Sequence, residues 1–124
     1  MHRPSLAVLA LAPLTVLALA PLARAQDAGE TIFKRYCAVC HSVEPGQNKI
    51  GPSLAGVVGR KAGSVADYSY TEANKNSGLT WTEAELDKYL TDPRQVVPGT
   101  KMLFAGLKNA DDRKAVIAYL KQQK

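Results

Sequence analysis

The sequence predicts an all-α domain with few helices and long loops. Strand-like alternation of apolar and polar residues is absent, whereas apolar residues recur at helical spacing in four segments. Two long segments rich in glycine and proline, 42–70 and 91–108, separate these helices, and such loops are unusual in a compact domain. The apolar inventory is also thin, with one tryptophan and two phenylalanines. We therefore expect the loops to wrap a bulky group that fills the middle of the domain.

Residues 1–25 have the composition of an export signal. Two basic side chains precede a long run of alanine, leucine and valine, which ends in Ala23-Arg24-Ala25, a small-x-small cleavage pattern. A membrane anchor is the alternative, but Pro13 and Pro21 interrupt the apolar run. We expect a cleaved signal peptide over residues 1–25, one mature domain over residues 26–124, and a periplasmic location.

Charge and length limit the possible partners. The chain has 16 lysines and arginines against 11 acidic residues, a net charge of +5, and the expected leader removes Arg3 and Arg24. The remaining charge of +3 is dispersed, so it suits an acidic protein partner and does not indicate nucleic-acid binding. A mature chain of 99 residues is one domain whose core is marginal without a staple, metal or cofactor.

Helix-start signals support three of the four expected helices. Asp27 and Glu30 form a capping-box pattern, as do Thr82 and Glu85, and Asn109 is a suitable N-cap for the last helix. The expected ranges are about 28–40, 71–77, 82–92 and 110–124.

The segment Cys37-Ala38-Val39-Cys40-His41 carries both cysteines, and three kinds of chemistry compete for it. A thiol redox pair opens a helix after a strand, whereas this motif ends an amphipathic helix. Structural zinc needs four ligands, but the mature chain offers two cysteines and one histidine. Two thiols at this spacing can straddle one porphyrin edge and add to its vinyl groups, with the next imidazole beneath the iron. The motif therefore predicts one covalent haem c, bound through Cys37 and Cys40 and ligated by His41.

Met102 is the expected second iron ligand. No other histidine remains in the mature chain, and Met102 is its one methionine. A lone methionine is usually core filler, but this one follows Pro98-Gly99 in a loop rather than on a helix face. A thioether ligand favours Fe(II) and raises the reduction potential relative to two nitrogens. With both axial positions taken, electron exchange through the haem edge is the chemistry that remains.

Residues along the whole mature chain form one further pattern. They are Gly29, Phe33, Cys37, Cys40, His41, Gly51-Pro52, Gly59-Arg60-Lys61, Tyr68-Ser69-Tyr70-Thr71, Ala73-Asn74-Lys75-Asn76, Trp81, Pro98-Gly99-Thr100-Lys101-Met102, Phe104-Ala105-Gly106 and Tyr119. With these residues the chain resembles class I cytochrome c, the family of the mitochondrial protein and of bacterial cytochrome c2. The resemblance implies the cytochrome c fold and one-electron transfer.

The resemblance also implies residue roles. Gly29 would let the first helix cross the last closely, beside Phe33 and Tyr119, although a glycine near a helix start has an equally simple explanation. The carbonyl of Pro52 would accept the free ring N–H of His41. The other implied haem contacts are Arg60, Tyr70, Asn74 and Trp81 around the propionates, Tyr89 near the Met102 sulfur, Thr100 tied to a propionate, and Phe104 over the exposed haem edge.

Two departures from the family concern partners. The loop between His41 and Pro52 is one residue shorter than in the mitochondrial proteins, and the ring of lysines around the haem edge is thinned. Lys101 and Lys108 remain, and Arg94 replaces another lysine. The positions that are often lysine but differ here are Thr31, Tyr36, Gln95 and Asn109. We expect a weakly basic docking face with a modest salt effect on rate.

The resulting hypothesis is a soluble periplasmic electron carrier of a respiratory chain, not an enzyme. Its expected partners are redox proteins, namely a membrane reductase and oxidase or other periplasmic enzymes; we expect a monomer, no nucleic acid and no stable membrane insertion. Two alternatives stay open. A haem peroxidase or ligand sensor could use the same attachment but needs a vacant or labile distal position. A haem subunit of a larger redox complex is the other.

Overall fold

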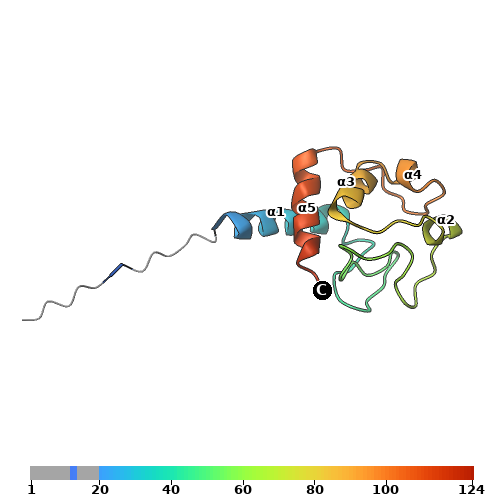
Figure 1. The fold of residues 1–124 in the computed structure, drawn as a ribbon, viewed down its shortest axis with the longest axis horizontal. Coiled ribbons are helices and arrows are strands. Elements are labelled where there is room, and N and C mark those ends of the chain that lie inside the picture. Colours follow the sequence, from blue (N-terminus) through green and yellow to red (C-terminus); the bar gives the residue numbers. More distant parts are fainter. Residues whose placement is uncertain (1–11, 14–19) are drawn as a thin grey trace, which may run out of the picture.

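The structure is a computed structural model that describes residues 12–13 and 20–124 (Figure 1). Most of the signal peptide expected over residues 1–25 lies outside the described residues. The helices of the described part are α1 (Ala20–Tyr36), α2 (Glu72–Lys75), α3 (Glu83–Thr91), α4 (Pro93–Val96) and α5 (Ala110–Lys121). These residues form no strand, and one isolated bridge joins Lys61 to Thr80. The predicted all-α fold with long loops is thus observed.

The crossing of α1 and α5 anchors the fold (Figure 1). Gly29 lies at the crossing, where an added Cβ would come within 2.6 Å of the Tyr119 Cβ and closer still to the Ala115 carbonyl oxygen. The rings of Phe33 and Tyr119 pack beside it with centroids 5.6 Å apart. The close crossing implied for Gly29 is therefore confirmed, and the simpler explanation is not needed.

Helix α1 differs from the prediction at both ends. It begins at Ala20 rather than near residue 28, because the alanines and leucine before Asp27 are good helix formers and Pro21 lies in the first turn, where proline is tolerated. The predicted capping box is wrong in this chain, since the Asp27 carbonyl accepts a bond from the Thr31 hydroxyl inside the helix, at 2.9 Å. The helix ends at Tyr36 because the amides of Cys37 and Ala38 converge on one carbonyl, that of Phe33.

The helices predicted from Thr82 and Asn109 begin at these N-caps, and Thr71, near the expected start of the second helix, caps α2 in the same way. Each cap side chain accepts a bond from the amide three residues on: Thr71 from Asn74 at 3.2 Å, Thr82 from Glu85 at 3.1 Å, and Asn109 from Asp112 at 3.0 Å. Helix α2 is shorter than expected and ends at Lys75. These starts were predictable because capping is a local interaction.

Helix α4 contradicts the expectation of a structureless segment over 91–108. Asp92 caps it by accepting a bond from the Gln95 amide, and Pro93 occupies its first turn. Proline suits that position because its missing N–H would have no partner there and its φ is already helical. A helix of one turn has no periodicity to detect, so the Asp-Pro pair was its one sequence signal.

The core lies where α3 and α5 meet the loops. Buried residues include Leu86 and Tyr89 of α3 and Val116, Ile117 and Leu120 of α5. A short ion pair also joins the two helices, with the Arg113 Nε 2.7 Å from an Asp87 carboxylate oxygen. Of the helices in the described residues, none has the combination of length and apolar composition that a membrane crossing requires.

Candidate haem site

The Cys-x-x-Cys-His motif forms a tight turn directly after α1. The amides of Cys40 and His41 both donate to the Cys37 carbonyl, at 3.0 and 2.9 Å. Both cysteines are free thiols and half-buried. Burial, with a smaller contribution from Cys40, raises the pKa of the Cys37 thiol to about 11. Reactive dithiols instead have a lowered pKa, so the direction at Cys37 is opposite to the one typical of a thiol redox pair.

The ring of His41 is oriented by a backbone carbonyl. Its Nδ1 donates to the Pro52 carbonyl at 2.8 Å, which is the contact that the family resemblance implies. Burial lowers the pKa of His41, the bond to Pro52 opposes this, and the nearby charges of Arg60 and Lys49 lower the pKa further. A neutral imidazole whose Nδ1–H is occupied presents its Nε2 lone pair, the form that binds metal.

The sulfur of Met102 lies within reach of a buried phenol. The Tyr89 hydroxyl is 3.8 Å from the Met102 Sδ and 3.4 Å from the Thr100 Oγ1, and burial raises the pKa of Tyr89. The Met102 amide donates to the same Thr100 oxygen at 3.2 Å. The Lys101 ammonium donates to the Ser69 carbonyl, which ties this loop to a distant one. The structure therefore brings Tyr89 to the Met102 sulfur, as the resemblance implies, and places Thr100 against both residues. The implied contact of Thr100 with a propionate stays a prediction.

Arg60 and Trp81 are held side by side by their backbones. The Trp81 amide donates to the Arg60 carbonyl at 2.8 Å, and the Trp81 side chain is buried. The Arg60 guanidinium donates to the carbonyls of Ala55 and Ser53, at 2.9 and 3.0 Å. Burial lowers the pKa of Arg60, but a guanidinium remains charged at neutral pH. A half-buried cation and a buried indole thus come from two backbone segments that are hydrogen-bonded to each other.

The side chain of Asn74 indicates whether a haem fits among the residues of this site. Its Oδ1 is buried and has no hydrogen-bond partner among the described residues. Leaving such a group unpaired costs on the order of 1–3 kcal/mol. If a carboxylate lay at this position, the Asn74 side-chain amide could rotate so that its nitrogen donates to the carboxylate. The oxygen would then leave the buried position, and the cost of the unpaired group would be removed. Two free thiols, a neutral imidazole and a thioether complete a donor set that fits a covalently attached haem.

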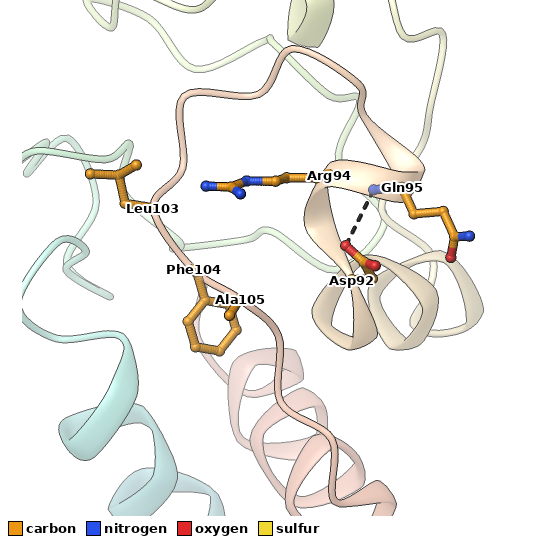
Figure 2. A pocket seen from close by; sticks show the side chains of 6 residues that line it. All are labelled: Asp92, Arg94, Gln95, Leu103, Phe104 and Ala105. Carbon is orange, nitrogen blue, oxygen red and sulfur yellow. Dashed lines mark hydrogen bonds between the residues drawn. The ribbon is translucent and has the colours of Figure 1, made fainter.

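Tyr70 and Phe104 are the remaining predicted haem contacts. The Tyr70 hydroxyl accepts a bond from the Val65 amide at 3.1 Å. Phe104 is half-buried and lines a surface hollow of about 620 Å³ between α4 and the segment that follows Met102 (Figure 2). The Arg94 side chain extends from α4 toward that segment (Figure 2). The hollow does not include the Cys37–His41 motif, so it lies outside the predicted ligand pair.

Two residues near the motif were not identified from the sequence as site residues. The Lys49 ammonium donates to the Ala38 carbonyl, inside the Cys-x-x-Cys turn. The Gly51 amide donates to the Cys40 carbonyl at 2.7 Å. Neither residue type signals such a contact, although Gly51 precedes the proline that orients His41.

Helices and loops arranged around a Cys-x-x-Cys-His turn and a methionine loop define a class of small haem proteins, the c-type cytochromes. A family model described as cytochrome c matches residues 26–124. Similar curated proteins include cytochrome c2 iso-2 of Magnetospirillum molischianum, 60% identical over 88 residues that cover 71% of this chain and 91% of the relative. Cytochrome c2 of Blastochloris viridis is 52% identical over 103 residues (81% and 80%), and cytochrome c of Arabidopsis thaliana is 50% identical over 96 residues (77% and 86%).

This chain belongs to the cytochrome c family. The predicted class I cytochrome c and its all-α fold are thereby confirmed. Its cofactor is a covalent haem c, and Cys37 and Cys40 have the spacing for its attachment. The chain is accordingly a monohaem electron carrier.

Proposed function

We propose that this protein carries single electrons between redox partners in the periplasm, through a haem attached at Cys37 and Cys40 and ligated by His41 and Met102. The observation that best supports the ligand pair is that hydrogen bonds already orient the His41 ring and the Met102 side chain. The His41 Nδ1 is already bound to the Pro52 carbonyl at 2.8 Å, and the Met102 sulfur lies beside a hydroxyl.

Bound haem supplies the one-electron Fe(III)/Fe(II) couple. The protein's part is to hold both ligands in place so that little moves when the charge changes. The Pro52 carbonyl fixes the His41 ring and raises the donor strength of its Nε2. The Tyr89 hydroxyl donates to the Met102 sulfur, which withdraws electron density from the thioether and disfavours ferric iron.

A second group of residues is proposed to bind the haem propionates: Arg60, Tyr70, Asn74, Trp81 and Thr100. Two of the five guanidinium N–H groups of Arg60 are bound to backbone carbonyls, so others remain for a carboxylate. The buried side-chain oxygen of Asn74, which has no hydrogen-bond partner among the described residues, supports the same placement. Neutralising a carboxylate beside buried Trp81 reduces the cost of placing a charge in the interior.

Around the proposed haem edge, covered by Phe104, the protein presents a weakly basic face. Arg94, Lys101 and Lys108 are exposed there, and exposed Leu103 adds an apolar contact. We propose docking of redox proteins, such as a membrane reductase and an oxidase or other periplasmic enzymes, by a monomer. The mild charge implies association that weakens only modestly with salt.

The proposed precursor is cleaved after residue 25, leaving the domain over residues 26–124. Cleavage would remove the first turns of α1, whose described side chains before Gly29 are exposed. The Gly29 crossing with α5 would remain intact, because it lies beyond the cut.

The ligand pair is tested with Met102→Ala in the haem-loaded protein. We expect loss of the weak far-red ferric band that reports an iron–sulfur bond, a lower reduction potential, and binding of added cyanide or imidazole at the freed position. Unchanged potential and ligand binding would show that Met102 is not a ligand. Fast peroxide turnover by the ferric wild type would instead favour an enzyme.

A further inference from the structure

Gly51 lies directly against the imidazole ring of His41. An added Cβ on Gly51 would be 2.7 Å from the ring Nδ1 and 2.8 Å from Nε2, and closer still to the Cε1 between them. Real Cβ atoms essentially never approach other heavy atoms within 3.0 Å. Any side chain at position 51 therefore displaces either the ring edge that carries both nitrogens or the backbone that faces it.

The backbone conformation gives no other reason for glycine at this position. Glycine is favoured where φ is positive, because other residues are strained there. The glycines with positive φ are Gly46, Gly56, Gly59, Gly63, Gly78, Gly99 and Gly106, and Gly51 is not among them. Alanine could adopt the backbone of Gly51, so the contact with the ring is the constraint.

The segment around Gly51 is held from two sides. The Gly51 amide donates to the Cys40 carbonyl at 2.7 Å. The Tyr68 hydroxyl donates to the Ile50 carbonyl at 2.8 Å, from a different loop. Gly51 is also buried. The segment cannot retreat from an added methyl group without breaking one of these bonds.

The ring is equally restrained. Its Nδ1 is bound to the Pro52 carbonyl, and its backbone follows Cys40, which the haem attachment fixes. We propose that Gly51 is a positioning residue: the absence of a side chain there sets the ring orientation of His41 and preserves its bond to Pro52. This inference rests on the proposed ligation of iron by His41.

The test is Gly51→Ala in the haem-loaded protein. Weakening the Nδ1–H bond to Pro52 lowers the donor strength of the imidazole, so ferric iron is stabilised less. We expect an upward shift of the reduction potential and altered EPR g values in the ferric state. NMR should show faster solvent exchange of the His41 Nδ1–H proton, while the iron–sulfur band persists.

The matched control is Gly46→Ala in the same loop. Gly46 has a φ of 72°, and nothing lies within 4 Å of an added Cβ, so this change strains the backbone without touching the ring. We expect it to lower stability but to leave the potential, the g values and the ring-proton exchange at their wild-type values. Equal shifts of these three quantities in both variants would overturn the proposal.

Tyr68→Phe keeps the proposal testable if Gly51→Ala does not accumulate with haem. It removes the bond to the Ile50 carbonyl and loosens the segment without adding an atom. Faster exchange of the His41 ring proton would support the proposal, and unchanged exchange would overturn it. A wild-type protein without His/Met ligation would overturn the proposed function itself, whereas a normal wild type with an unshifted Gly51→Ala variant overturns this inference alone.

Discussion

The substitution Gly29→Ala has two opposing effects of comparable size on the free energy of unfolding. Alanine is the better helix former, so intrinsic propensity alone predicts a gain of about 1 kcal/mol in the free energy of unfolding. Against this, the new methyl would come within 2.6 Å of the Tyr119 Cβ and closer to the Ala115 carbonyl oxygen. A backbone atom cannot swing away as a flexible side chain can, so we place the overpacking cost at roughly 3 kcal/mol, the upper part of the usual range.

The clash therefore wins, and we expect a net loss of about 2 kcal/mol. For a domain of this size the melting temperature should fall by roughly 8–16 °C. The assay is guanidinium unfolding of the mature, haem-loaded protein, followed by far-UV circular dichroism. Thr31→Ala, at an exposed site on the same helix, is the control and should change stability by less than about 0.5 kcal/mol. A Gly29→Ala protein as stable as wild type, or more stable, would refute the close crossing.

Two further predictions concern the core and the methionine loop. Arg113→Ala removes the bond to Asp87 at 2.7 Å and two bonds to backbone carbonyls at 3.0 Å, so denaturant titration should show a loss of roughly 2 kcal/mol. The control Lys121→Ala breaks a half-exposed ion pair with Glu83 and should lower the free energy of unfolding by less than about 1 kcal/mol. Equal losses in the two variants would contradict the larger contribution assigned to the Arg113 bonds. Tyr89→Phe removes the hydroxyl near the Met102 sulfur, which makes the sulfur a better donor to ferric iron. Voltammetry should show a potential lower by roughly 20 mV, equivalent to about 0.5 kcal/mol, and a rise would show that the hydroxyl does not act on the sulfur.

Features of the fold and the site that depend on residues close together in the sequence could be predicted from it. Thr82 and Asn109 were identified as caps because their partners lie three residues away. The thiols and the imidazole were assigned together because they are adjacent in the sequence. The one-turn helix α4 was missed since it has no apolar repeat. The start of α1 was missed because residues 20–27 continue the helix beyond its expected start.

Contacts between distant segments could not be derived from spacing. The sequence alone left the role of Gly29 undecided, because its partner Ala115 lies on the last helix. The contact of Gly51 with His41 depends on how a loop folds back over the motif, which no periodicity reports. The grouping of Arg60, Asn74 and Trp81 around the haem propionates stays a prediction from family resemblance, since no physical signal in the sequence joins these three separate segments.

The central claim is that one haem is bonded to this polypeptide at Cys37 and Cys40. The most direct measurement is the intact mass of the exported protein, purified and denatured so that loosely held groups are lost. The account predicts the mass of residues 26–124 plus one haem, and a red product. A colourless protein whose mass equals that of its amino acids alone would contradict it.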